Sequence, residues 1–156
     1  MESQASADAA PNAERTPPLC PSAHPEMKGS RVFGVMGGTA ASPLLLYLDK
    51  PTPVTQEILD LAKPVKPTEV YRLAAPCVES QCCHFDGHDC RLVTRIVRIL
   101  PAVTDTLPPC RIRHECRWFA QEAGAACQRC PQVITDNCSP SDQMVQAATP
   151  EPPPPA

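Results

Sequence analysis

The pattern of hydrophobic and polar positions predicts a small α+β unit in the first half of the chain. Residues 31–37 (RVFGVMG) and 43–49 (PLLLYLD) are apolar and β-prone, and a short glycine-containing segment separates them, which predicts a β-hairpin. Thr55 is a candidate N-cap for a short helix that ends before Pro64. Residues 68–75 predict a third strand.

The clearest helical period lies in residues 91–100, where the apolar residues share one face and three arginines share the other: Arg91, Arg95 and Arg98. Asp89 is the candidate N-cap, and Pro101 ends the helix. We expect the arginine face to be solvated and to steer an acidic partner. Residues 111–123 predict a second helix, with Gly124 in the C′ position.

Composition changes this picture, because the 156 residues include 10 Cys and 21 Pro but few aromatic side chains. A core with so many proline breakers is marginal at this size, so a metal or a covalent link is expected to support it. The predicted fold is α+β, with a small N-terminal β-hairpin/helix cap followed by a cysteine-rich, metal-stabilised helical region. We expect a disordered N-terminal segment at 1–26, the cap at 27–76, the metal-binding region at 77–137 and a Pro-rich disordered tail at 138–156, which ends in a polyproline II sequence.

The chemical role expected for the cysteines depends on the cellular compartment that the sequence predicts. The first 26 residues have neither a basic segment nor an apolar run, and no stretch approaches 18 apolar residues, so we expect a cytoplasmic protein without a membrane span. In a reducing cytosol, cysteines serve as metal ligands or redox groups more often than as a disulfide framework.

One cysteine group comprises Cys110, Cys116, Cys127 and Cys130. Four thiolates are the number that a [2Fe–2S] or [4Fe–4S] cluster, or a Cys₄ zinc site, requires. Only the last pair has the short spacing of a zinc knuckle, so the wider gaps favour a cluster over zinc, with free or disulfide-bonded cysteines as a third alternative. Trp118 and Phe119 lie beside Cys116, where they either pack in the core or shield a metal centre from water.

The charge around this group is locally positive, although the whole chain carries −3. Arginines outnumber acids between Cys110 and Cys130, which indicates either an ordinary solvated surface or compensation for an anionic thiolate centre. The basic cluster is small and no nucleic-acid recognition motif accompanies it, so no nucleic-acid partner is expected.

A second group contains Cys77, Cys82, His84 and Cys90, which would hold a second centre. Cys83 is predicted to be redundant, because adjacent side chains rarely face one metal. His84 is either a metal ligand or a surface loop histidine. Alternatively, Cys77, Cys82 and Cys90 bind metal together with cysteines of the other group, at sites that the two groups share. Two further cysteines, Cys20 and Cys138, lie in the flanks and are predicted to be peripheral.

Other chemistry is less well supported. The glycines of residues 34–39 lack the GK[ST] ending of a phosphate loop, and no helix pattern follows them. A Cys/His nucleophile pair is formally available, yet clustered cysteines favour a metal over a lone activated thiol. We therefore predict no catalytic residue.

The cysteine region resembles a small family of bacterial cysteine-rich proteins often labelled "nitrogen fixation protein". The resemblance rests on Pro76-Cys77-x4-Cys82-x-His84-Phe-Asp-Gly87, on Leu107-Pro-Pro-Cys-Arg-Ile-Arg113 and on Ala126-Cys-x-x-Cys-Pro-Gln-Val133, and it covers roughly residues 20–137. It implies a role around metallocluster or redox chemistry without a defined activity. It also implies that Cys83 and Cys138 are dispensable.

The sequence thus predicts an iron–sulfur protein that acts as an electron carrier, or as an accessory to a larger metalloenzyme or biosynthetic pathway, with a protein partner. One alternative is a zinc-stabilised interaction module without redox activity. Another is a cluster- or zinc-dependent enzyme of specialised metabolism, although no acid/base pair supports it.

Overall fold

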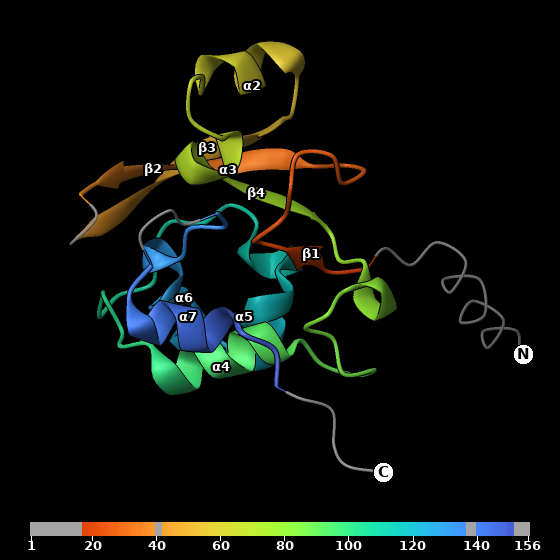
Figure 1. Ribbon diagram of the computed structural model, residues 1–156, viewed down its shortest axis with the longest axis vertical. Coiled ribbons are helices and arrows are strands. Elements are labelled where there is room, and N and C mark those ends of the chain that lie inside the picture. The colour runs from red at the N-terminus through yellow and green to blue at the C-terminus, as the bar shows by residue number, and fades with distance from the viewer. Residues whose placement is uncertain (1–16, 40–41, 137–139, 152–156) are drawn as a thin grey trace, which may run out of the picture.

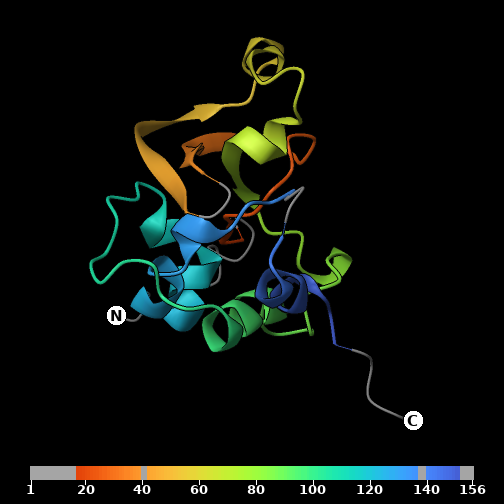
Figure 2. The same cartoon turned by 60° about the vertical axis from the view of Figure 1, so that its left-hand side comes forward.

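A computed structural model describes residues 17–39, 42–136 and 140–151. One layer is an antiparallel sheet of four strands in the order β1-β4-β2-β3 (Figure 1). The other layer contains short helices that lie together on one side of the sheet (Figures 1 and 2). The predicted α+β class is therefore confirmed. The strands are β1 (Leu19–Cys20), β2 (Arg31–Gly38), β3 (Pro43–Pro53) and β4 (Tyr71–Pro76).

The predicted hairpin is confirmed as β2 and β3, which pair antiparallel from Arg31↔Pro53 to Gly38↔Pro43. The central strand β4 pairs with β2 on one side and with β1 on the other, where Cys20 faces Ala75. All residues of β4 from Tyr71 to Ala75 are buried. The sheet therefore ties the segment around residue 20 to the end of the cap.

The helix predicted after Thr55 is confirmed as α2 (Gln56–Leu61), whose first turn is capped by the Thr55 hydroxyl accepting from the amide of Ile58 at 3.3 Å. The third strand begins later than predicted, because residues 67–70 form the short helix α3 (Pro67–Val70). Proline suits the first position of a helix, since its fixed φ is helical and its missing N–H has no partner there.

The periodic segment forms α4 (Arg91–Ile99), as predicted. Its N-cap is Cys90 and not Asp89. The prediction of a fully solvated arginine face is wrong, because the Arg95 side chain is only 2% exposed and donates to the carbonyl of Ala147 at 2.8 Å. All three arginines of that face also lie within 3.8 Å of the Glu151 carboxylate.

The single helix predicted for residues 111–123 is wrong. The chain forms the 3₁₀ turn η3 (Arg113–Glu115), then α5 (Arg117–Glu122) and α6 (Gly124–Cys127). Extended backbone at Cys116 separates the first two, and Ala123 separates the last two because its φ of 55° is incompatible with a continuing helix. Gly124 therefore begins a helix and does not end one.

The two flanks contain structure where composition predicted disorder. At the C-terminal side, α7 (Asp142–Ala148) packs against α4 and buries Ala147 among Val93, Ile96 and Leu100. At the N-terminal side, β1 and the buried Ala23 belong to the folded part. Residues 1–16, Cys138 and the proline run at 152–156 lie outside the described residues.

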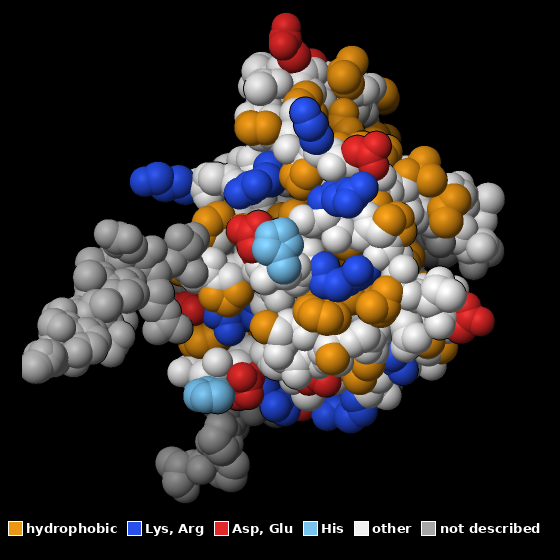
Figure 3. Space-filling view, turned by 180° about the vertical axis from the view of Figure 1, so that it is seen from behind, with side chains coloured by type: hydrophobic (Ala, Val, Ile, Leu, Met, Phe, Trp, Pro, Cys, Tyr) orange, Lys and Arg blue, Asp and Glu red, His pale blue; other side chains and the backbone are white. Residues whose placement is uncertain are grey.

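None of the helices in the described part of the chain has the length and apolar character of a membrane span. On the face shown in Figure 3, basic side chains are interspersed with acidic and hydrophobic ones.

The close approach of β2 and β3 generates a testable prediction. A Cβ on Gly34 would lie 2.6 Å from Leu45 Cδ1 and 3.2 Å from the Leu46 carbonyl, whereas a Cβ on Gly37 would meet no atom closer than 3.8 Å. We expect Gly34→Ala to lower the free energy of unfolding by about 1–3 kcal/mol through overpacking. Gly37→Ala is the matched control and should leave the free energy of unfolding nearly unchanged. Equal urea midpoints for the two variants would contradict the packing described here.

Candidate functional site

The four cysteines between residues 110 and 130 converge on one cavity beneath the sheet. Cys110 lies in the loop before η3, Cys116 is the N-cap of α5, Cys127 ends α6 and Cys130 begins the turn η4 (Cys130–Gln132). All four line the cavity. Its wall is completed mainly by aromatic side chains from the sheet and α5, namely Phe33, Tyr47, Trp118 and Phe119.

The cavity is small and apolar. Its free volume of about 20 Å³ corresponds to about one water-sized sphere. Burial raises the pKa of the Cys116 thiol to about 12 and also raises that of Cys110, so a bound metal would displace protons from these sulfurs.

Arg72 on β4 is a fully buried cation beside this cavity. Its guanidinium donates to the carbonyl of Pro21 at 2.9 Å, to those of Cys130 and Val133 at 2.7 and 2.9 Å, and to the Cys130 sulfur at 3.1 Å. It also lies 5.4 Å from the Phe33 ring centroid and 5.8 Å from that of Trp118. Among the described residues its acceptors are three backbone carbonyls and the Cys130 sulfur, and no carboxylate is among them.

Two further buried donors belong to the cavity wall. Trp118 Nε1 and Arg113 Nε have no hydrogen-bond partner within the described residues. Burial raises the pKa of Cys127, and the guanidinium of Arg113 opposes this by bonding to the sulfur. Two residues of the cavity wall thus contain buried N–H donors without a partner, which is rare for buried polar groups.

Cys20 on β1 lies near the other cysteine group, because β1 pairs with the end of β4 that leads into Cys77. Burial raises the pKa of Cys20 to about 12, and electrostatic repulsion from the sulfurs of Cys77, Cys82 and Cys90 adds to the effect. Cys20 therefore belongs to the sheet and not to a separate N-terminal flank. A strand of two residues is too short to give a periodic signal, and its pairing with β4 alone brings Cys20 into the group.

The His84 side chain contacts Arg95. Its Nδ1 lies 2.7 Å from Arg95 Nη2, and burial followed by the charge of Arg95 lowers the pKa of the imidazole. The ring therefore accepts a hydrogen bond from Arg95 through Nδ1 in its neutral form. Cys83 is exposed.

Backbone amides act on the sulfurs of both groups with a regular spacing. The sulfurs of Cys77 and Cys82 accept hydrogen bonds at 3.4 Å from the amides of Glu79 and His84, two residues further along the chain. Burial raises the pKa of Cys20 and Cys110, and an amide two residues further along opposes this shift in each case. Burial also raises the pKa of Cys90 and Cys116, and the opposing amides there are three and two residues further along. Hydrogen bonds of this kind stabilise thiolates and tune bound metal centres.

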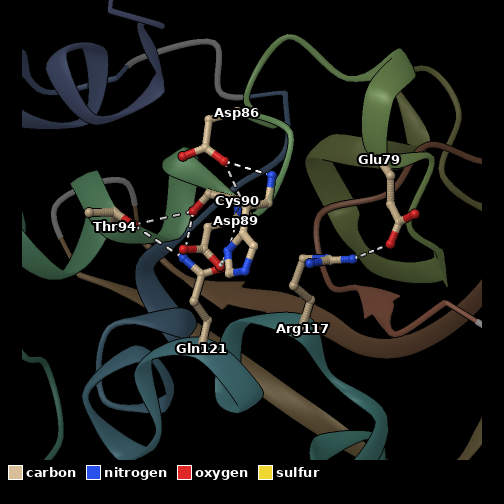
Figure 4. A network of polar contacts seen from close by, with 8 residues as sticks. Glu79, Asp86, Asp89, Cys90, Thr94, Arg117 and Gln121 are labelled. Atoms are coloured by element: carbon tan, nitrogen blue, oxygen red, sulfur yellow. Dashed lines mark hydrogen bonds and ion pairs between the residues drawn. The ribbon is translucent and has the colours of Figure 1, made fainter.

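Helix α5 connects the two groups (Figure 4). It begins after Cys116, and its Gln121 side chain accepts from the Cys90 amide at 2.9 Å and donates to the Cys90 carbonyl at 2.8 Å. Arg117 pairs with Glu79 at 2.6 Å, next to the turn that carries Cys77 and Cys82. Helix α5 therefore contacts residues of both cysteine groups.

No set of three or more His, Cys, Asp or Glu side chains in the described ranges is already arranged to hold a metal ion. The cysteines of these ranges are free thiols. Comparisons with protein-family models, with curated proteins and with solved structures found no match.

Sequence reasoning missed the residues that the sheet contributes to the site. Arg72 is a charged residue within the apolar stretch Tyr71–Ala75, and a charge in a strand buried on both faces is a recognisable signal of a buried polar role. Phe33 and Tyr47 gave no such signal, because aromatic residues are ordinary strand residues.

Removing the buried cation tests its structural importance. We expect Arg72→Met to lower the free energy of unfolding by about 3 kcal/mol or more. The substitution leaves buried carbonyls without the hydrogen-bond donor that the guanidinium provides. Arg111→Met is the control, since Arg111 is 57% exposed and its pair with Asp49 is solvated; its effect should stay within about 0.5 kcal/mol. Similar urea denaturation curves for both variants would contradict the role given to Arg72.

Proposed function

We propose that the protein is an iron–sulfur protein in which Cys110, Cys116, Cys127 and Cys130 bind a [4Fe–4S] or [2Fe–2S] cluster. The observation that carries this proposal is the buried guanidinium of Arg72 on the Cys130 sulfur. A permanent positive charge in the interior needs a negative partner, and four metal-bound thiolates supply one.

The unpartnered donors support the same assignment. A cluster bound at the cavity would present sulfur acceptors to Trp118 Nε1 and Arg113 Nε, which lack partners among the described residues. The aromatic wall would limit the access of water, and exposure to water is one of the factors that set the potential of a cluster.

The function that follows is one-electron transfer, as a carrier or as an accessory to a larger metalloenzyme or biosynthetic pathway. The bound cluster supplies the redox change, and the chain's own residues position it, exclude water and offset its charge. Leu44 and Leu46 on the hairpin are each more than half exposed, which supports docking of a protein partner at the cap. The resemblance to the family labelled "nitrogen fixation protein" supports a role in metallocluster or redox chemistry. The free thiols of the described residues fit the cytoplasmic location expected from the sequence.

Zinc is the second candidate, because the free volume of about 20 Å³ accommodates a single ion. Four thiolates satisfy tetrahedral zinc, and the protein would then be a zinc-stabilised interaction module without redox activity.

Metal analysis of the full chain distinguishes the two candidates. Protein purified without oxygen should be brown and should contain iron with acid-labile sulfide. Colourless protein with stoichiometric zinc and no iron would overturn the first proposal in favour of the second.

A matched pair of cysteine variants tests the ligand assignment. Cys127→Ser should lose the metal of this site and lower the thermal midpoint, because binding and folding are coupled. Cys83→Ser changes an exposed thiol and should retain both properties of the wild type. Full metal content in Cys127→Ser would remove Cys127 from the ligand set.

A further inference from the structure

We propose that Cys20, Cys77, Cys82 and Cys90 bind a second iron–sulfur cluster, next to the first, and that the protein passes electrons between the two. This extends the proposed function to a site whose fourth ligand is Cys20 and not His84. The inference depends on how the fold brings an N-terminal strand to the loop that follows β4.

The sheet places Cys20 beside Cys77. Cys20 faces Ala75 across the antiparallel pair of β1 and β4, and the amide of Cys77 donates to the carbonyl of Pro18 at 2.9 Å. Cys20 and Cys77 are therefore diagonal neighbours on paired backbone, at about 7–8 Å between their Cα atoms.

Two tight turns bring in the remaining thiols. The turn η2 (Glu79–Gln81) folds the chain so that the amide of Cys82 donates to the carbonyl of Glu79 at 2.8 Å. Phe85 then bonds back to the carbonyl of Cys82 at 3.1 Å and forms a bridge with Cys90 at the start of α4. This folding explains how ligands far apart in sequence converge.

The local hydrogen bonds fit thiolates. Amides two residues on donate to the sulfurs of Cys77 and Cys82 at 3.4 Å. The backbone of Cys90 is held at both its amide and its carbonyl by Gln121, so its position depends on α5. His84 meanwhile presents Nδ1 to Arg95, which commits that nitrogen to a protein partner.

The two groups are adjacent through the backbone. Leu19, which precedes Cys20, forms a parallel bridge with Cys116 of the first site. Two clusters at these positions exchange a single electron: the reduced cluster loses it, the oxidised cluster gains it, and no atom or proton moves. The external partner is a one-electron donor, for which dithionite serves as the probe.

Iron content of anaerobically reconstituted full-length variants tests the ligand set. If both clusters are of the four-iron type, the wild type should hold about eight iron atoms per chain. Cys20→Ser should lose about half of the iron, whereas His84→Ala and the control Cys83→Ser should keep all of it. Full iron in Cys20→Ser, or loss of half in His84→Ala, would overturn the assignment of Cys20.

Electron paramagnetic resonance of the dithionite-reduced wild type provides a test that needs no variant. Two neighbouring clusters should give a spectrum broadened by spin–spin interaction, and a single isolated-cluster signal would overturn the inference even where Cys20→Ser fails to fold. Zinc in this group together with an intact cluster in the other would also overturn it, while leaving the proposed function standing. Absence of iron from the wild type would contradict both this inference and the proposed function.

Discussion

Arg72 leaves the central strand of the sheet, enters the interior between Phe33 and Trp118, and donates hydrogen bonds to two separate parts of the chain. These are Pro21 before the hairpin and the turn from Cys130 to Val133 in the cysteine region. A guanidinium in this position keeps its charge, so buried acceptors must surround it. Three backbone carbonyls and the Cys130 sulfur, which lies at the cavity of thiols, are those acceptors.

The same contact makes the cap and the cysteine region parts of one core. Leu19, Phe33, Leu45, Ala74 and Ile112 form a single buried cluster, and Cys110 and Cys130 pack against it. The sheet therefore forms one wall of the site. A metal bound to the thiols would stabilise a structure whose apolar core is limited by its many prolines. The proposal of two adjacent clusters extends this idea, because β1 and α5 each contact both cysteine groups.

Local signals predicted the elements that depend on local interactions. The hairpin, the helix capped by Thr55 and the amphipathic helix α4 were all predictable, because turn residues, a capping hydroxyl and apolar periodicity act over a few residues. The four cysteines between residues 110 and 130 were predictable as one group from their number and spacing, and all of them line one cavity.

Long-range contacts decided the rest. Ala123 adopts a positive φ that no local signal indicated, and this divides the predicted second helix. Arg95 is buried because α7 packs over α4, and α7 lies in a segment whose proline-rich composition predicted disorder. Cys20 is more than fifty residues from its neighbours in the group, so only the pairing of β1 with β4 reveals it.

The central claim is that buried cationic and amide donors surround thiolates that share iron. X-ray absorption at the iron and zinc edges of the anaerobically purified chain tests it most directly. The account predicts iron with a sulfur shell and a second shell of neighbouring iron. Zinc with a sulfur shell alone, or iron without an iron neighbour, would contradict it.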